Sequence, residues 1–340
     1  MMHFMISQHK LFPKHIYWRS KLYRVYITRK IPEAGLRLLK DHGFELDIWP
    51  GDLPPSKEEL KRGISQADAM ISLLTDKIDE EVISNARNLK VIANYAVGYD
   101  NIDLEAATKA GIVVTNTPDV LTETTADLAW ALMLSVARRL IEGVSYVKDG
   151  KWRTWEPQLL LGQDVYGATL GIVGMGRIGQ AVARRAIGFQ MKVLYTSRSE
   201  KTGIDAQKVS LDELLAQSDF ISLHAPLTKE TRHMINKSTL RRMKPTAILI
   251  NTARGPLVDT AALVEALREG QIAGAGLDVT DPEPLPRDHP LLYLPNCIVV
   301  PHIGSASQRT RDLMSEIAAR NVIAVLEGSQ APNQVNILGS

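Results

Sequence analysis

A glycine-rich turn and the polar side chains that follow it are the residues of this chain best suited to chemistry. The turn is Gly174-Met175-Gly176-Arg177-Ile178-Gly179, and Arg254, Glu283 and His302 come after it in that order. Glycines at this spacing seat dinucleotide phosphates, arginine binds carboxylates, and a histidine beside a carboxylate is a proton donor suited to neutral pH. Together they predict hydride transfer between a nicotinamide cofactor and a 2-keto acid.

The glycine-rich turn stands between a predicted strand, Thr169–Val173, and a predicted helix, Gln180–Ile187. In that context the first glycine allows a tight turn, and the second lets a pyrophosphate approach the backbone. The third lets the helix pack close to the strand. The N–H groups at the start of the helix would face the phosphates. This arrangement predicts a dinucleotide-binding site.

The end of the next predicted strand indicates which dinucleotide binds. Sites for NAD usually carry an acidic residue there, which holds the ribose 2′-hydroxyl. After Lys192–Tyr195 this chain has Ser197-Arg198-Ser199 instead, with Lys201 near and Glu200 beyond the strand end. An arginine can bind a 2′-phosphate with two N–H groups, and small hydroxyl side chains leave room for that phosphate and can donate to it. We therefore expect NADP(H) to be preferred, with NAD(H) as the alternative.

The three polar side chains each come just after a predicted strand. Because ligands of parallel sheets bind at the carboxyl ends of strands, we expect these side chains to share one cleft. Arginine stays charged at any working pH, so Arg254 could hold a substrate carboxylate and polarise the adjacent keto oxygen. Pro282 and Pro284 restrict the backbone around Glu283, whose carboxylate would orient His302 as the proton donor. The histidines show no metal-ligand spacing, and we expect no metal.

Short apolar runs that alternate with helical patterns predict an α/β fold with parallel sheets. Two such alternations indicate two Rossmann-like or flavodoxin-like lobes with an active-site cleft between them. The strands expected in the first alternation are Tyr23–Thr28, Phe44–Ile48, Ala69–Leu73, Val91–Ala93 and Ile112–Thr115. Those expected in the second are Thr169–Val173, Lys192–Tyr195, Phe220–Leu223, Ala247–Ile250, Gly276–Val279 and Ile298–Val300. Long helices are expected over Thr124–Val147 and Ala306–Leu326.

These elements predict a discontinuous first domain. We expect residues 23–118 plus 305–340 to form the substrate (catalytic) domain and 119–304 to form the dinucleotide-binding domain. Residues 1–22 are expected to be a loose N-terminal extension, because the first acidic residue is Glu33 and several basic residues precede it. A targeting leader and an over-extended start, with Met5 as a candidate first residue, are the two interpretations of this extension.

Composition excludes several classes of function. The 340 residues carry a net charge of +2, which gives no field for nucleic acid or acidic lipid. No apolar stretch approaches the ~20 residues of a membrane span. Cys297 is the only cysteine, which excludes an internal disulfide and thiolate-rich metal sites and fits a cytoplasmic setting.

The motifs resemble those of the D-isomer-specific 2-hydroxyacid dehydrogenase family. After the glycine-rich turn come Asn251-Thr252-Ala253-Arg254-Gly255, Gly276-Leu277-Asp278-Val279 with Glu283-Pro284, and Pro301-His302-Ile303-Gly304, in the family's order. The resemblance covers almost everything from about Tyr23 to Asn336. Within the family the chain is most similar to glyoxylate/hydroxypyruvate reductases, on the segments Tyr95–Asn101, Thr117–Asp127 and Trp152–Pro157.

The resemblance implies an enzyme that uses NAD(P)H to reduce glyoxylate or hydroxypyruvate to glycolate or D-glycerate. It implies catalytic roles for Arg254, Glu283 and His302, and a homodimer in which Trp155 reaches a partner's pocket. The implied substrate-binding residues are Val97, Gly98, Arg254 and His302. The implied cofactor-binding residues are Gly174, Met175, Gly176, Arg177, Ile178, Gly179, Ser197, Arg198, Ser199, Thr252, Ala253, Arg254, Asp278, His302, Ile303 and Gly304.

Other functions remain open at this point. A reductase for another 2-keto acid and a phosphite dehydrogenase would keep the same arginine, glutamate and histidine. A nucleotide-sensing scaffold of the corepressor type would use the same fold without turnover. Phosphoglycerate dehydrogenase fits less well because Thr117–Asp127 differs from its version, and formate dehydrogenase usually carries glutamine where Glu283 stands.

Overall fold

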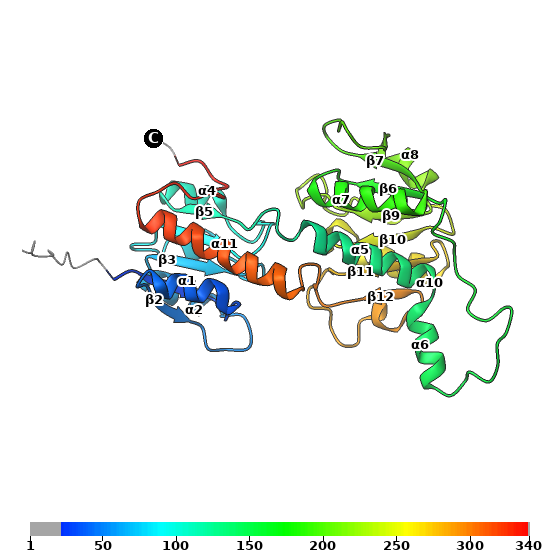
Figure 1. Cartoon of the computed structure of the whole chain (residues 1–340), viewed down its shortest axis with the longest axis horizontal. Coiled ribbons are helices and arrows are strands. Elements are labelled where there is room, and N and C mark those ends of the chain that lie inside the picture. Colours follow the sequence, from blue (N-terminus) through cyan, green and yellow to red (C-terminus); the bar gives the residue numbers. More distant parts are fainter. Residues whose placement is uncertain (1–21, 339–340) are drawn as a thin grey trace, which may run out of the picture.

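The computed structural model describes residues 22–338. The predicted N-terminal extension, with its two interpretations, lies outside these residues except for Leu22. The fold has two lobes, each built on a parallel sheet, joined by the long helices in the middle of the molecule (Figure 1). This confirms the expected α/β class.

The first lobe contains a five-stranded parallel sheet with the order β2-β1-β3-β4-β5. Its strands are β1 (Arg24–Ile27), β2 (Glu45–Ile48), β3 (Ala69–Ser72), β4 (Val91–Asn94) and β5 (Val113–Thr115). The central strand β3 and its neighbour β4 are buried along their whole length, because helices cover both faces of the sheet. All five strands lie where the sequence predicted them.

Helices from both ends of the chain cover this sheet. They are α1 (Glu33–Asp41), α2 (Lys57–Gln66), α3 (Glu80–Ile83), α4 (Leu104–Lys109) and α11 (Gln308–Leu326). The last helix returns to the first lobe and packs along α1 and over β4. The contact is close: Gly35 N donates to Ser315 Oγ at 3.0 Å, and a side chain at position 35 would overlap the Ser315 backbone. The domain limits at 118/119 and 304/305 stay a prediction.

The second lobe contains a seven-stranded parallel sheet with the order β12-β11-β10-β9-β6-β7-β8. The strands are β6 (Thr169–Val173), β7 (Lys192–Thr196), β8 (Gln207–Lys208), β9 (Phe220–Leu223), β10 (Ile248–Asn251), β11 (Gly274–Leu277) and β12 (Cys297–Val299). The six predicted strands are present, with ends shifted by up to two residues. The edge strand β8 was missed because two exposed polar residues carry no strand pattern.

The remaining helices lie between β5 and α11 in the chain. They are α5 (Thr122–Ala137), α6 (Leu140–Lys148), α7 (Arg177–Ala186), α8 (Leu211–Gln217), α9 (Lys237–Leu240) and α10 (Thr260–Arg268). Short 3₁₀ turns occur at Ile187–Phe189, Gly255–Leu257 and Pro290–Tyr293. Helix α5 packs on α7, β10 and β11. None of the helices in the described part of the chain is long and apolar enough to cross a bilayer.

The single helix predicted over Thr124–Val147 is wrong, because the chain breaks it into α5 and α6. Arg139 has φ 52°, a left-handed conformation that ends α5. The carbonyl of Ala137, which a continuous helix would use internally, accepts instead from Gln163 N at 2.8 Å. The segment that returns after α6 therefore supplies, through Gln163 N, the hydrogen bond that the next turn of α5 would have made to this carbonyl. Helix α6 then projects from the lobe with no buried residue (Figure 1).

Candidate active site

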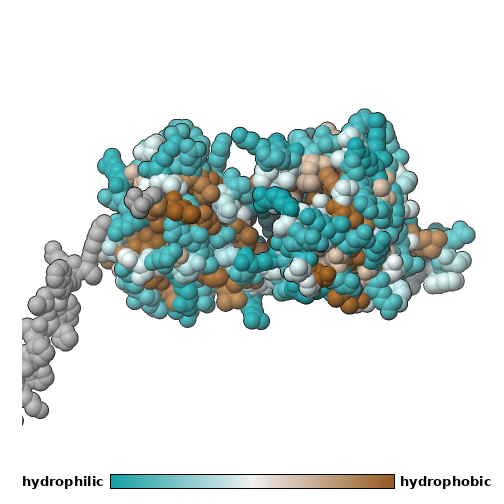
Figure 2. Space-filling view, turned by 90° about the horizontal axis from the view of Figure 1, so that it is seen from above, coloured by the Kyte–Doolittle hydropathy of each residue, from teal (hydrophilic) through white to brown (hydrophobic). Residues whose placement is uncertain are grey.

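A cleft of about 1540 Å³ lies between the lobes, and residues of both line it. Figure 2 shows the surface hollowed at this position. The carboxyl ends of β4 and β5 reach the cleft from one side, and those of β9, β10, β11 and β12 from the other. This is where parallel sheets place their ligands.

The structure brings most of the predicted site residues together in this cleft. Those that line it are Val97, Gly98, Gly176, Arg177, Ile178, Arg198, Thr252, Ala253, Arg254, Asp278, Glu283, His302 and Gly304. The others lie just behind or beside the lining: Gly174, Met175, Gly179, Ser197, Ser199 and Ile303. No group of side chains in residues 22–338 has the make-up of a metal site.

The glycine-rich turn has the geometry of a phosphate cradle. Gly174 has φ 98°, and a side chain there would lie 2.6 Å from the backbone nitrogen of Ala225. Gly176 precedes the first residue of α7 and has open space where a Cβ would be. At Gly179 a Cβ would overlap the Gly174 carbonyl. The residues present therefore fit a dinucleotide, because the backbone at the helix start is uncovered by side chains.

The turn after β7 presents Arg198 to the cleft. Within residues 22–338 its side chain forms no hydrogen bond or ion pair. The pKa of the nearby Glu230 carboxyl is lowered, mainly by a hydrogen bond from Thr228 and to a smaller extent by the charge of Arg198. The Ser197 hydroxyl donates to the Ser199 carbonyl at 2.5 Å. The Ser197 hydroxyl is therefore already used as a donor within the turn, whereas the guanidinium of Arg198 is available to an anion.

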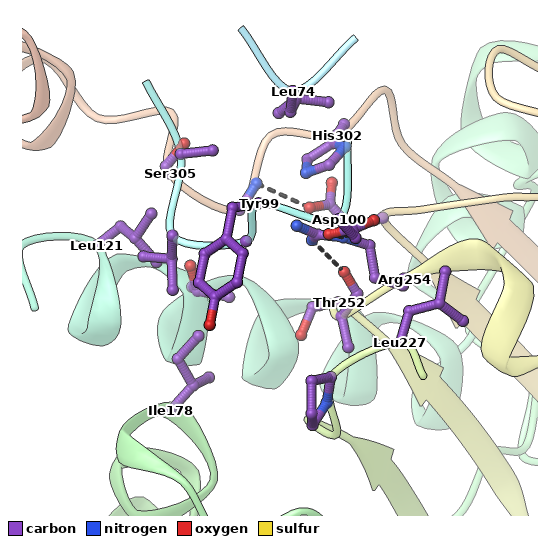
Figure 3. A pocket seen from close by; sticks show the side chains of 18 of the residues that line it. Leu74, Tyr99, Asp100, Leu121, Ile178, Leu227, Thr252, Arg254, His302 and Ser305 are labelled. Carbon is purple, nitrogen blue, oxygen red and sulfur yellow. Dashed lines mark hydrogen bonds and ion pairs between the residues drawn. The ribbon is translucent and has the colours of Figure 1, made fainter. Parts of the chain in front are cut away.

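His302 and Glu283 form the pair predicted from the sequence. Nδ1 of His302 lies 2.6 Å from Oε1 of Glu283, and the other oxygen of this carboxylate accepts from Thr280 N at 3.3 Å. Nδ1–H is therefore the donor to the carboxylate. In the described part of the chain Nε2 of His302 makes no hydrogen bond, and the ring lines the cleft. Figure 3 shows it close to Asp100 and Arg254.

The backbone around His302 is held by Asp278 at the end of β11. The two oxygens of this buried carboxylate accept from Ile303 N at 2.6 Å and Gly304 N at 2.8 Å. Burial raises the pKa of Asp278, while the two N–H donors lower it. His302 has φ 52°. Asp278 thus fixes a strained turn that presents the histidine, a role that the strand-end pattern did not reveal.

Arg254 is fixed on two sides. Its Nε donates to both oxygens of Asp100, at 3.0 and 3.3 Å, and Nη1 donates to the Ala253 carbonyl at 2.8 Å. A Cβ at position 98 would overlap Nη2. The guanidinium therefore crosses from the second lobe to lie on Gly98 of the first. Nη2 is the part left for a substrate.

Two residues of the cleft were missed from the sequence. Asp100 lies in a segment quoted for the resemblance, but nothing in the sequence indicated that it would meet Arg254. His224 follows β9, and the same strand-end rule could have found it. Its Nε2 lies 2.8 Å from Ser222 Oγ, and burial lowers the pKa of His224 to about 4. This ring is neutral near pH 7 and is not suited to donate a proton to a substrate.

The chain is similar to known proteins over most of its length. Residues 130–304 match the family model described as D-isomer specific 2-hydroxyacid dehydrogenase, NAD binding domain. A glyoxylate reductase of Korarchaeum cryptofilum is 55% identical over 318 residues, 92% of this chain and 96% of that protein. A glyoxylate reductase of Thermococcus onnurineus is 54% identical over 321 residues, 92% and 96% of the two chains.

Solved structures are similar in sequence and fold. A protein from Thermus thermophilus has a TM-score of 0.88 and 54% identity, over 92% of this chain and 99% of that one. An NADPH-dependent glyoxylate/hydroxypyruvate reductase from Sinorhizobium meliloti, in complex with NADP and malonate, has a TM-score of 0.84 and 33% identity, over 93% and 97%. The chain therefore belongs to the D-isomer specific 2-hydroxyacid dehydrogenase family and is an oxidoreductase with a nicotinamide-binding domain.

Proposed function

We propose that this enzyme uses NADPH to reduce glyoxylate and hydroxypyruvate to glycolate and D-glycerate. The observation that carries the proposal is the placement of the His302–Glu283 pair and of Arg254 in one cleft with the phosphate turn. The names of the similar proteins from K. cryptofilum and S. meliloti support both substrates.

Arg254 and the backbone of Val97 and Gly98 bind the substrate carboxylate. Nη2 of Arg254 lies at Gly98, so its charge and the nearby N–H groups can meet one carboxylate. The carboxylate then fixes the adjacent keto carbon near His302, across the cleft from Ile178 at the start of α7. Holding the reacting groups in this way removes much of the entropic cost of the reaction.

His302 is the proton donor. A bound nicotinamide dinucleotide, held by Gly174–Gly179, Thr252, Ala253 and the 302–304 turn, would supply the hydride from its nicotinamide ring. Nε2 of His302 gives its proton to the carbonyl oxygen as negative charge develops there, and the guanidinium of Arg254 stabilises that charge. Glu283 holds the ring by Nδ1 and stabilises its protonated form before the transfer.

The walls around these groups are apolar. Figure 3 shows Leu74, Leu121, Ile178 and Leu227 around the space beside Tyr99. Such side chains exclude water and strengthen the electrostatic interactions of Arg254. Closure of the two proposed domains, 23–118 with 305–340 and 119–304, would complete the exclusion of water.

Arg198 sets the preference for NADPH. It is the cationic side chain at the end of β7 that lines the cleft, and the Ser197 hydroxyl beside it is bonded to the Ser199 carbonyl. Two N–H groups of its guanidinium can bind a 2′-phosphate. Glu200, the carboxylate that could instead hold a ribose hydroxyl, is exposed and does not line the cleft.

Two copies of the chain associate through a projecting arm, which we define as α6 and the segment that follows it to Trp155. Leu140, Ile141, Val144 and Val147 of α6 are each about half exposed or more, and Trp155 further along is 79% exposed. Apolar side chains gathered on one unsupported helix mark an interface, and a second copy presents the same arm. Trp155 reaches the partner's pocket in this dimer.

The proposal is tested by NADPH and NADH oxidation with glyoxylate, hydroxypyruvate, pyruvate and a bulky 2-keto acid, and with phosphite and NADP as a separate arm. We expect turnover of the two small substrates and higher kcat/KM with NADPH than with NADH. Activity confined to the bulky acid or to phosphite would overturn the substrate assignment. Binding of NADPH without turnover of any substrate would favour a nucleotide-sensing scaffold.

A further inference from the structure

Three successive carbonyl groups in the loop after β4 point back into the first lobe. The Ala96 carbonyl accepts from Thr117 N at 2.9 Å. The Val97 carbonyl accepts from Nδ2 of Asn116, and the Gly98 carbonyl from Nδ2 of Asn94, both at 2.8 Å. Two of the three peptide groups are therefore held by side-chain amides.

In a trans peptide the N–H points away from the C=O of the same group. The N–H groups opposite these three carbonyls belong to Val97, Gly98 and Tyr99. None of them donates to an acceptor in residues 22–338, and all three residues line the cleft. Consecutive free N–H groups of this kind form a cradle for an anion.

The two asparagines are themselves firmly placed. Asn94 ends β4 and is fully buried; its Oδ1 accepts from Ser72 Oγ at 3.0 Å, and Nδ2 also donates to Oδ1 of Asn101 at 3.0 Å. Asn116 follows β5, the strand beside β4, and is 9% exposed. Both donors thus come from the carboxyl edge of one sheet. Aspartate has no donor in its ionised form and could not hold a carbonyl in this way.

The opposite wall of the cradle is Arg254. Its Nη2 lies directly against Gly98, as described above. If the Val97–Gly98 peptide rotated, the N–H of Gly98 would turn away from this guanidinium and the carbonyl oxygen would turn toward it. The carbonyl would then satisfy the guanidinium and compete with a substrate carboxylate. The Asn116 bond opposes that rotation.

We propose that Asn116 and Asn94 are positioning residues that aim the N–H groups of Gly98 and Tyr99 at the substrate carboxylate. This inference rests on the proposed function, because it assumes an anionic substrate in the cradle. Neither asparagine touches the reacting atoms. Their effect is on carboxylate binding, and hence on KM more than on kcat.

The test compares Asn116→Ser and Asn116→Asp with the wild-type enzyme. Serine adds no charge and is shorter than asparagine by one atom, so its hydroxyl cannot reach the Val97 carbonyl that Nδ2 of Asn116 holds at 2.8 Å. Aspartate keeps the size and replaces the donor by an acceptor. We expect KM for glyoxylate to rise about tenfold in Asn116→Ser and further in Asn116→Asp, with kcat within about threefold of wild type. Oxalate, a non-reacting dianion, should bind about tenfold more weakly by calorimetry, and NADPH affinity should be unchanged. Asn94→Asp should act in the same direction.

The matched control is Asn336→Asp. Asn336 is also buried in the first lobe, and its Nδ2 donates to the Ile112 carbonyl at 2.9 Å, but it does not line the cleft. This variant should lose stability and keep its KM. Folded Asn116 variants with KM and oxalate affinity within about twofold of wild type would overturn the inference. If the wild-type protein reduces no 2-keto acid, the proposed function fails, and oxalate binding alone decides the role of the asparagines.

Discussion

Nη2 of Arg254 occupies the space that the Cβ of any residue other than glycine at position 98 would take. The contact joins the two lobes at the point where a substrate carboxylate would bind. It is reinforced by Asp100, which accepts from Nε of the same guanidinium at 3.0 Å. The observed position of Arg254 therefore requires a glycine at position 98, and in the proposed function the two residues bind the carboxylate together.

Substitution of Gly98 by alanine should displace Arg254. We expect KM for glyoxylate to rise about 100-fold, because a charged hydrogen-bonding partner of the carboxylate is misplaced, while NADPH affinity is kept. Steady-state kinetics and a cofactor titration measure both quantities. The control is Gly188→Ala, since a Cβ there would have open space. Equal KM values for glyoxylate in the Gly98→Ala and Gly188→Ala variants would show that substrate binding by Arg254 does not depend on a glycine at position 98.

Removal of the Arg198 guanidinium should weaken the discrimination between cofactors. We expect Arg198→Ala to raise KM for NADPH about 10- to 100-fold, since a charged bidentate interaction is lost, and to change KM for NADH little. Arg320→Ala, on α11 in the first lobe, is the control for loss of one exposed arginine. If the Arg198→Ala enzyme kept its preference for NADPH, residues other than Arg198 would bind the 2′-phosphate.

The single thiol should be unreactive in the folded protein. Burial raises the pKa of Cys297 to about 12, so at pH 8 only about one thiol in 10⁴ is ionised. Alkylation of the native protein should be slow and should accelerate about tenfold per pH unit, and unfolding in guanidinium should release a fast-reacting thiol. Because the folded pKa is raised, the associated stability is present below the unfolded pKa of ~8.5 and is lost as pH rises toward 12. Fast labelling of native protein at pH 8 would contradict this environment.

A charge on the exposed apolar side of α6 should disrupt the proposed dimer. Val144 is 50% exposed, and burying a glutamate there in an apolar interface is costly. We expect Val144→Glu to sediment as a monomer at concentrations where the wild-type protein is a dimer. Leu53→Glu is the control, because Leu53 is 77% exposed on the first lobe, away from the arm. A wild-type monomer, or a dimeric Val144→Glu protein, would place the interface elsewhere.

Elements with a strong local pattern were predicted well from the sequence. Six of the seven strands of the second lobe pair an apolar run with a turn signal, and Arg254, Glu283 and His302 were found because each follows such a run. The rule that ligands bind at strand carboxyl ends then placed them in one cleft. These predictions depend on residues close together in the chain.

Features set by distant parts of the chain were not predictable in the same way. The break between α5 and α6 depends on Gln163, which takes the Ala137 carbonyl from beyond the helix. The contact of Asp100 with Arg254 joins residues 154 positions apart. The Val97 carbonyl in the loop at Gly98 accepts from Nδ2 of Asn116 at 2.8 Å, and the type of residue 116 suggests only a turn. In each case the partner is fixed by tertiary packing, for which the sequence carries no local signal.

The central claim is that His302 donates the proton during NADPH-dependent reduction of a small 2-keto acid. His302→Asn tests it most directly, because asparagine tolerates the left-handed backbone at φ 52° and lacks the proton donor. His233→Asn is the matched control, a partly exposed histidine with φ 51° that does not line the cleft. We predict that His302→Asn lowers kcat for glyoxylate by about 10²- to 10⁴-fold, with NADPH affinity kept and His233→Asn unchanged. Near-wild-type kcat in a folded, NADPH-binding His302→Asn enzyme would contradict the account.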